Sequence, residues 1–303
     1  MTELELVERI RRLAGGRRAA ELIRSIGDDC AILRPGGSRE DLLVTTDMLV
    51  EGVHFRPGTH SAAQTGYKAL ARALSDVAAM GGAPKWCLVS IALPEWADAR
   101  WVREFIGGVV RLGRATKTTL IGGDLARSAQ FACDVVLIGS VPPGGAIRRD
   151  TARAGDRVFV SGELGGSALG LERGAGKAWR KHVRPEPRLG LGQFLRRRRL
   201  ATACIDLSDG LSIDLHRLCR ESRVSARLDK PLPVFRGATL DQALHGGEDY
   251  ELLFTAPPGS AVPKEVGGIR LTSIGRIEKG RAGEVRLLDR PLLPLGYDHF
   301  RHS

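Results

Sequence analysis

The stretch "CIDLSDGL" (residues 204–211) places two carboxylates, Asp206 and Asp209, where an apolar strand ends and a helix begins. An apolar run precedes Asp206, and leucines at helical spacing follow from residue 211. Similar acidic positions occur in "GDDCAI" (27–32), "TTDMLVEGVHF" (45–55), "LSDVAAMGG" (74–82) and "IGGDLAR" (121–127). The recurrence of acidic residues at the ends of apolar elements decides which fold and which kind of site we expect.

The composition is that of a packed globular protein of about two domains, with 303 residues of which 43% are hydrophobic. No apolar run approaches the ~18 residues that a membrane span needs, and "MTELELVERIRR" does not have the pattern of a signal peptide. We therefore expect a cytoplasmic protein with no membrane partner. The cysteines are odd in number and form no CxxC pair, which predicts reduced thiols and no zinc site: Cys30, Cys87, Cys133, Cys204 and Cys219.

The formal net charge of +11 raises the possibility of a nucleic-acid partner. Its densest block, "RRRR" at 196–199, follows a helical pattern and is typical of a solvated helix face. Only 5% of the residues are aromatic, and no RNA-binding module is recognisable. A basic protein suits anionic phosphate substrates equally well, so we expect no nucleic-acid partner and keep that class as a minor alternative.

The pattern of apolar residues predicts an α+β fold, since strands and helices mix without a regular βαβ repeat. In the first half we expect a helix near the N-terminus with Leu6, Ile10 and Leu13 on one face. Further helices are expected over 62–80 and 98–115, and strands over 41–47, 86–93, 118–124 (closed by a glycine turn) and 131–141. The segment 142–156, rich in Pro, Gly and Arg, predicts a domain boundary. Beyond it, strands are expected over 157–162 and 250–256.

Acidic residues beside glycine turns have two interpretations. Each one can be a helix cap or a turn former, and Asp209 in particular can cap the helix that follows it. If the element ends converge, however, the carboxylates repel one another unless cations intervene, and oxygen ligands without His or Cys favour magnesium. Magnesium in turn points to phosphoryl transfer. The residues concerned are Asp29, Asp47, Asp76, Asp124, Asp206 and Asp209.

The usual nucleotide-binding signatures are absent from the sequence, which has no GxxxxGK[ST] loop, no GxGxxG and no kinase HRD or DFG set. The glycine-rich "SGELGGSALGL" (161–171) could present backbone amides to a phosphate at a helix start. Close packing of a strand against a helix explains those glycines equally well. No Ser-His-Asp or Cys-His arrangement is visible that would supply a nucleophile.

The combination of motifs resembles the thiamine-monophosphate kinase family, in the superfamily that also contains aminoimidazole-ribonucleotide synthetase and selenophosphate synthetase. The acidic turns fit the whole superfamily, whereas "TTDMLVEGVHF" (45–55), "GGEDYEL" (246–252) and "GYDHF" (296–300) point to this member. The resemblance implies ATP-dependent phosphorylation of thiamine monophosphate to thiamine diphosphate by direct in-line transfer, with several Mg²⁺ ions and ATP as co-substrate.

The resemblance also assigns residues by position. Magnesium-ligand positions are Asp29, Thr45, Thr46, Asp47, Asp76, Asp124, Asp206 and Asp209. ATP-contact positions are Gly123, Asp124, Arg149 (or the adjacent Arg148) and Ser208. Thiamine-phosphate contacts are His54, Glu248 and Tyr297. It further implies a homodimer whose N-terminal mixed sheets join into a barrel, an N-terminal domain over 1–145 and a sandwich-like C-terminal α/β domain over 146–303, with the active site between them.

Other interpretations stay open at this point. His54 can be a packed histidine, Glu248 a turn carboxylate, and Tyr297 a core aromatic residue. The protein can also be another ATP-using member of the superfamily with a different small substrate, or a non-catalytic nucleotide-binding scaffold. The last two alternatives predict that thiamine monophosphate does not cause consumption of ATP.

Overall fold

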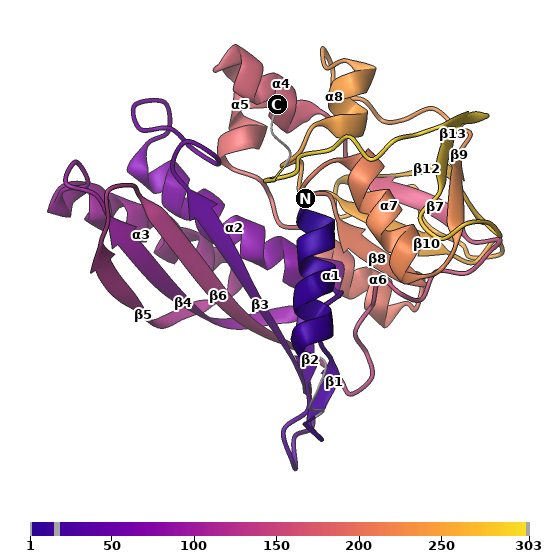
Figure 1. The fold of residues 1–303 in the computed structure, drawn as a ribbon, viewed down its shortest axis with the longest axis horizontal. Coiled ribbons are helices and arrows are strands. Elements are labelled where there is room, and N and C mark those ends of the chain that lie inside the picture. Colours follow the sequence, from indigo (N-terminus) through magenta and orange to yellow (C-terminus); the bar gives the residue numbers. More distant parts are fainter. Residues whose placement is uncertain (1, 15–18, 301–303) are drawn as a thin grey trace.

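The computed structural model describes residues 2–14 and 19–300 and has an α+β architecture with two sheets (Figure 1). Helix α1 (Glu3–Ala14) lies at the N-terminus. The mixed α+β class predicted from the sequence is confirmed. Within the described ranges, no helix combines the length and apolar character that crossing a membrane requires.

The first sheet contains six strands in the order β1-β2-β3-β6-β4-β5. Their bounds, in chain order from β1 to β6, are Leu22–Arg24, Ala31–Leu33, Asp41–Val50, Ala83–Leu93, Thr119–Arg127 and Ala132–Val141. Neighbouring strands are antiparallel except for β4 and β5, which are parallel and are connected through α3 (Ala99–Thr116). Helices α2 (Ala62–Ala79) and α3 lie on the same face of this sheet (Figure 1).

The second sheet follows the order β14-β13-β9-β12-β7-β10-β8, and β11 pairs with β12. Its strands, from β7 to β14, are Arg157–Ser161, Ala203–Asp206, Ser225–Leu228, Leu252–Ala256, Glu265–Val266, Ile269–Glu278, Val285–Leu287 and Arg290–Pro291. The pairs are antiparallel except for β9 with β13. The accompanying helices, from α4 to α8, are Gly166–Arg173, Gly176–Val183, Leu189–Arg197, Leu211–Glu221 and Leu240–His245.

Helix α2 connects the two sheets because it is buried on more than one side. Its leucines Leu70 and Leu74 belong to the core of the first sheet. Ala78 and Ala79, at its C-terminal end, belong to a different core that includes Leu195 of α6 and residues of the second sheet. Both cores therefore fix the position of any α2 side chain that lies between Leu74 and Ala78.

Most predicted elements agree with the structure, and one needs a correction. The strand expected to end in a glycine turn continues through Gly122 and Gly123 to Arg127; a Cβ on Gly123 would lie 1.9 Å from the Val89 carbonyl oxygen, so close strand pairing explains that glycine. The apolar face of α1 is not a core face, since Leu13 is 85% exposed. Helix α1 is instead attached to α7 through ion pairs, including Arg11 with Glu221 at 3.0 Å.

Two glycines set the distance between α2 and α3. A Cβ on Gly66 of α2 would lie 1.9 Å from the Phe105 carbonyl oxygen, and one on Gly108 of α3 would lie 2.1 Å from the Ala63 carbonyl oxygen. The adjacent Gly107 has open space around its Cβ position. The contact between these helices therefore excludes a side chain at position 108 but tolerates one at position 107.

We predict opposite stability changes for two neighbouring substitutions in α3. Gly108→Ala should lower the free energy of unfolding by about 1–3 kcal/mol, because the methyl group overpacks the contact with α2. Gly107→Ala should raise it by about 0.5–1 kcal/mol, because alanine has the higher helix propensity. Urea denaturation of both variants measures the difference. Equal shifts in the same direction would contradict the helix contact described here.

Candidate active site

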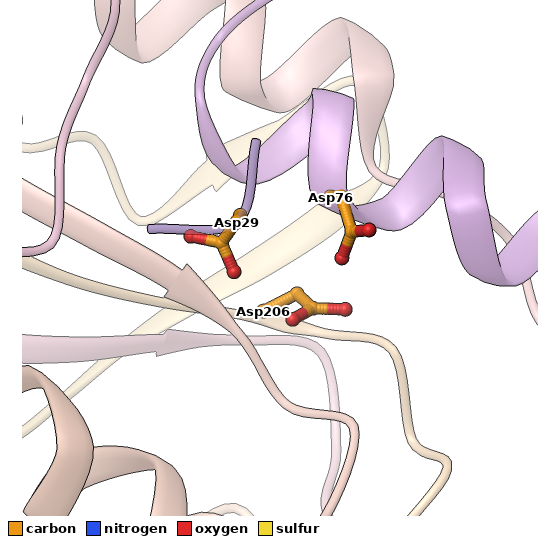
Figure 2. A group of neighbouring side chains, drawn as sticks. All are labelled: Asp29, Asp76 and Asp206. Atoms are coloured by element: carbon orange, nitrogen blue, oxygen red, sulfur yellow. The ribbon is translucent and has the colours of Figure 1, made fainter. Parts of the chain in front are cut away.

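Three carboxylates from separate parts of the chain lie together and point toward one another (Figure 2). Asp29 lies in the loop between β1 and β2, Asp76 lies near the C-terminal end of α2, and Asp206 is the last residue of β8. One carboxylate oxygen of each lies within 4.8 Å of the others. Three of the predicted acidic positions therefore converge, as expected if they share a ligand.

The electrostatics of this acidic cluster (Asp29, Asp76 and Asp206) favour a bound cation. Burial raises the pKa of all three carboxyl groups, and the neighbouring carboxylates raise the pKa of Asp76 and Asp206 further. The Oδ2 atoms of Asp29 and Asp206 are buried and accept no hydrogen bond from the described residues. Closely spaced oxygen ligands with unused acceptor capacity fit a hard divalent cation such as Mg²⁺.

Two neighbours hold the acidic cluster in position. The Thr45 hydroxyl donates a hydrogen bond to Asp76 Oδ2 at 2.6 Å. Arg149 Nη2 donates to Asp29 Oδ1, also at 2.6 Å, and its charge lowers the pKa of Asp29 against the larger effect of burial. Arg148 is directed elsewhere and pairs with Asp150 at 2.8 Å. Of the two adjacent arginines, Arg149 is therefore the one beside the acidic cluster.

A pocket of about 400 Å³ adjoins the acidic cluster. Five predicted magnesium-ligand positions line it: Thr46, Asp47, Asp76, Asp206 and Asp209. Ser208 from the predicted ATP set and all three predicted substrate contacts, His54, Glu248 and Tyr297, line it too. Segments far apart in the sequence thus contribute to one site.

Gly123 and Asp124 are not brought to this pocket by the single chain. Both lie on the exposed strand β5, at the edge of the first sheet. The register across the sheet runs from Asp47 through Val135 and Val89 to Gly123, which separates Gly123 from Asp47 by three strand spacings. At ~4.8 Å per spacing this distance is about 14 Å.

The carboxylate of Asp209 does not cap the helix that follows it. The N-cap of α7 is Gly210, and no side chain bonds there as a cap. Asp214 instead accepts hydrogen bonds from the amides of Asp209 and Gly210 at 3.0 and 3.1 Å. The Asp209 side chain pairs with Arg217 and lines the pocket, so the capping interpretation is wrong for this residue.

Backbone hydrogen bonds place the "GGEDYEL" segment beside "CIDLSDGL". The Glu248 amide donates to the Ser208 carbonyl at 2.7 Å, and the Tyr250 amide donates to the Leu207 carbonyl at 2.9 Å. Glu248 and Tyr250 have positive φ angles of 65° and 49°, which are unfavourable for residues with side chains. Strain of this kind persists only where the surroundings fix the conformation, which is typical of functional sites.

His54 and Tyr297 occupy different depths of the pocket. His54 is buried, its Nδ1 accepts the Val50 amide at 3.0 Å, and burial lowers its pKa to about 3, so the imidazole is neutral. Tyr297 is 45% exposed, and its amide donates to the Asp209 carbonyl at 2.9 Å. Its ring meets His299 edge-on at 4.8 Å between centroids. Tyr297 is therefore not a core aromatic residue.

Sequence reasoning missed two cationic residues of the site. Lys68 and Arg72 precede Asp76 on α2 at intervals of four residues, which places all three on one face of the helix. Arg72 binds Asp47 with two hydrogen bonds, at 2.7 and 3.1 Å, and Lys68 binds Glu248. The four-residue spacing was the available signal, since these charged residues interrupt an otherwise apolar helix.

In the glycine-rich segment 161–171, two backbone amides at the start of α4 already have an anionic partner. Asp249 accepts hydrogen bonds from the amides of Gly165 and Ser167 at 2.6 and 3.0 Å. A Cβ on Gly170 would lie 2.3 Å from the Ala178 carbonyl oxygen. The packing interpretation of these glycines is therefore the one that the structure supports.

Comparisons with known proteins agree with this geometry. Residues 27–141 match the family described as AIR synthase related protein, N-terminal domain, and residues 153–287 match the corresponding C-terminal domain. A thiamine-monophosphate kinase of Escherichia coli (strain K12) is 37% identical over 316 aligned residues, which cover 95% of each protein.

Solved structures give the same result. The structure called AaThiL complexed with AMPPCP and TMP is 33% identical with a TM-score of 0.87, and the match covers 99% of this chain and 97% of that chain. Thiamine-monophosphate kinase from Stenotrophomonas maltophilia is 37% identical with a TM-score of 0.77, over 95% and 97% of the two chains. This similarity extends over nearly the whole chain and includes both sheets, and the chain belongs to the thiamine-monophosphate kinase family of AIR synthase related proteins.

Proposed function

We propose that the protein transfers the terminal phosphoryl group of ATP to thiamine monophosphate and forms thiamine diphosphate and ADP, a step of thiamine diphosphate biosynthesis. The observation that carries this proposal is the convergence of Asp29, Asp76 and Asp206 beside a pocket that also contains Glu248 and Tyr297. A phosphate oxygen of thiamine monophosphate forms the new P–O bond as the bond to ADP breaks. Direct transfer needs no nucleophile from the protein.

The acidic cluster is proposed to hold Mg²⁺, because its donor set is all oxygen and two of its oxygens have no hydrogen-bond partner among the described residues. Bound magnesium ions neutralise charge on the transferring phosphoryl group. Further ligand positions, which rest on the family resemblance, are Thr45, Thr46, Asp47, Asp124 and Asp209.

The remaining residues are proposed to bind and orient the two substrates. Arg149 lies beside the acidic cluster, and its planar guanidinium suits phosphate oxygens. Gly123, Asp124 and Ser208 are the other proposed ATP contacts. For thiamine monophosphate, a carboxylate from Glu248 and the Tyr297 ring suit a cationic aromatic ring, with His54 as the third proposed contact.

We propose a homodimer in which the first sheets of two copies form a barrel. Helices α2 and α3 lie on one face of this sheet (Figure 1), while Met48 and Trp86 are 55% and 41% exposed. Association through the sheet would remove such apolar side chains from water. Strand β5, which carries Gly123 and Asp124, lies at the edge of the same sheet.

The domain division at residues 145 and 146 is also proposed. It lies between the two family matches, which end at residue 141 and begin at residue 153. A cytoplasmic location is proposed because the five cysteines are free and buried, as expected for a protein in a reducing compartment.

The function predicts a specific reaction. Incubation with ATP, Mg²⁺ and thiamine monophosphate should give equal amounts of ADP and thiamine diphosphate, which chromatography resolves. Other small acceptors, such as selenide and the open-chain precursor of aminoimidazole ribonucleotide, tested in parallel, should give no product. Consumption of ATP with one of these acceptors, and none with thiamine monophosphate, would assign the protein to another activity of the superfamily.

Substitutions at two aspartates should separate a metal-binding role from a capping role. Asp206→Asn should reduce turnover by orders of magnitude while the melting temperature of the metal-free protein stays equal or rises, because one of three crowded carboxylates is removed. Asp98→Ala is the matched control, since Asp98 caps α3 by accepting the Trp101 amide at 2.7 Å. It should cost about 0.5–2 kcal/mol of stability and leave turnover intact. A destabilised Asp206→Asn protein with normal turnover would make Asp206 a structural residue.

The proposed dimer predicts a solution mass of twice 32.7 kDa at micromolar concentration. Trp86→Glu should shift the protein toward the monomer, because it places a charge on the apolar face of the first sheet. Arg236→Glu, in the exposed segment between β9 and α8, should leave the mass unchanged. Light scattering after size-exclusion chromatography measures both, and an active monomer in the unsubstituted protein would contradict the proposal.

A further inference from the structure

Lys68 is a fully buried lysine whose ammonium group contacts three residues that line the pocket, His54, His182 and Glu248. Its side chain has no exposure to solvent, although lysine is among the residues least often buried. The Nζ atom donates to the His54 carbonyl at 3.0 Å and to Glu248 Oε2 at 2.9 Å. A buried charge is tolerated only when it is paired and hydrogen-bonded, so this arrangement fixes the position of the ammonium closely.

The third neighbour of this ammonium is His182 of α5, whose Nε2 lies 3.4 Å from Nζ. An ammonium group can only donate, so Nε2 is the acceptor and the ring proton is on Nδ1, which lies 2.9 Å from the Ser167 hydroxyl. Burial, with Lys68 next in importance, lowers the pKa of His182 to about 3. The imidazole is neutral, and it leaves Glu248 as the anionic partner of Lys68.

Lys68 is the main positive charge acting on Glu248. Burial alone would raise the pKa of this carboxyl group, but the nearby cations, first Lys68 and then Arg72, lower it to about 2. Its Oε1 atom lies 2.8 Å from Nζ but is buried and accepts no hydrogen bond from a described residue. The Glu248 side chain is nevertheless 21% exposed and lines the pocket, so the pair presents a charged carboxylate to a ligand there.

The backbone of Glu248 has an unfavourable conformation. Its φ of 65° lies in the left-handed region, which costs free energy for a residue with a Cβ. The hydrogen bond from its amide to Ser208 fixes the backbone, but within the described residues the carboxylate takes its hydrogen bond from Lys68. Besides Lys68, the nearest side chain to this carboxylate is that of His182, whose Nδ1 lies 3.4 Å from Glu248 Oε2, beyond the range of a strong hydrogen bond. Lys68 is therefore its closest and only charge-assisted hydrogen-bond donor among the described residues.

We propose that Lys68 is a positioning residue for substrate recognition, which holds the Glu248 carboxylate ionised and correctly oriented before thiamine monophosphate binds. This inference rests on the proposed function, because it assigns the Glu248 carboxylate to the ring portion of that substrate. Lys68 contacts neither the acidic cluster nor Arg149, so its effect is on recognition of the acceptor and not on ATP.

A double-mutant cycle tests this coupling. Glu248→Gln should raise the KM for thiamine monophosphate by about tenfold or more, because a charge-assisted hydrogen bond is lost, and should leave the KM for ATP within about twofold. Lys68→Met should give the same pattern. The double variant Lys68→Met/Glu248→Gln should be no worse than Glu248→Gln alone, because Lys68 acts through Glu248.

Lys68→Met leaves a buried carboxylate without its cation and can fail to fold; in that case Glu248→Gln and the double variant decide. A double variant with a KM for thiamine monophosphate far above that of Glu248→Gln would overturn the proposal. So would a folded Lys68→Met protein with a lower melting temperature but unchanged KM, since that result assigns Lys68 a structural role only.

The control is Lys85→Met, which removes the lysine of another Lys–Glu pair, formed with Glu40 in a more exposed position. It should leave both KM values unchanged. Failure of the proposed function appears separately, because the unsubstituted protein would then form no thiamine diphosphate. Failure of the inference about Lys68 would appear only in the variants of a protein that does form it.

Discussion

Three buried carboxylates, those of Asp29, Asp76 and Asp206, lie with oxygens within 4.8 Å of one another, and the remaining structure has to hold them there against their mutual repulsion. Each comes from a different element, so the distances between them are set by the tertiary structure and not by any one local segment. Asp76 also lies near the C-terminal end of α2, where the helix dipole disfavours negative charge. An arrangement this unfavourable without a ligand is understandable if cations and phosphate groups occupy the site during the reaction.

Helix α2 is the element that makes the arrangement possible. It is buried by the first sheet on one side and by α6 and the second sheet at its end, which fixes its rotation about its axis. Lys68, Arg72 and Asp76 follow at four-residue intervals on one face and contact Glu248, Asp47 and the acidic cluster in turn. The same helix thus positions the proposed acceptor contact, an ion pair of the pocket and a proposed metal ligand.

The sequence predicted the four longer strands of the first sheet and its helices, because their apolar patterns are long and regular, as in 62–80 and 131–141. It missed the three-residue strands β1 and β2, which are too short to show a pattern. It missed β12, Ile269–Glu278, because polar and charged residues interrupt the apolar pattern of that strand. The acidic residues could be named from their positions and from the family resemblance, but their convergence depends on the register of strands far apart in the chain. Lys68 was overlooked because lysine is expected on the surface. The roles of Gly123 and Asp124 stay predictions, since a single chain leaves them on an exposed edge strand.

The most direct test is a calorimetric measurement of Mg²⁺ binding in the presence of a non-hydrolysable ATP analogue, for the unsubstituted protein and for Asp76→Asn. If the acidic cluster holds the metal, the unsubstituted protein should bind Mg²⁺, and Asp76→Asn should bind it about tenfold more weakly or worse while remaining folded. Equal binding of Mg²⁺ by the two folded proteins would contradict the assignment of these carboxylates as its ligands.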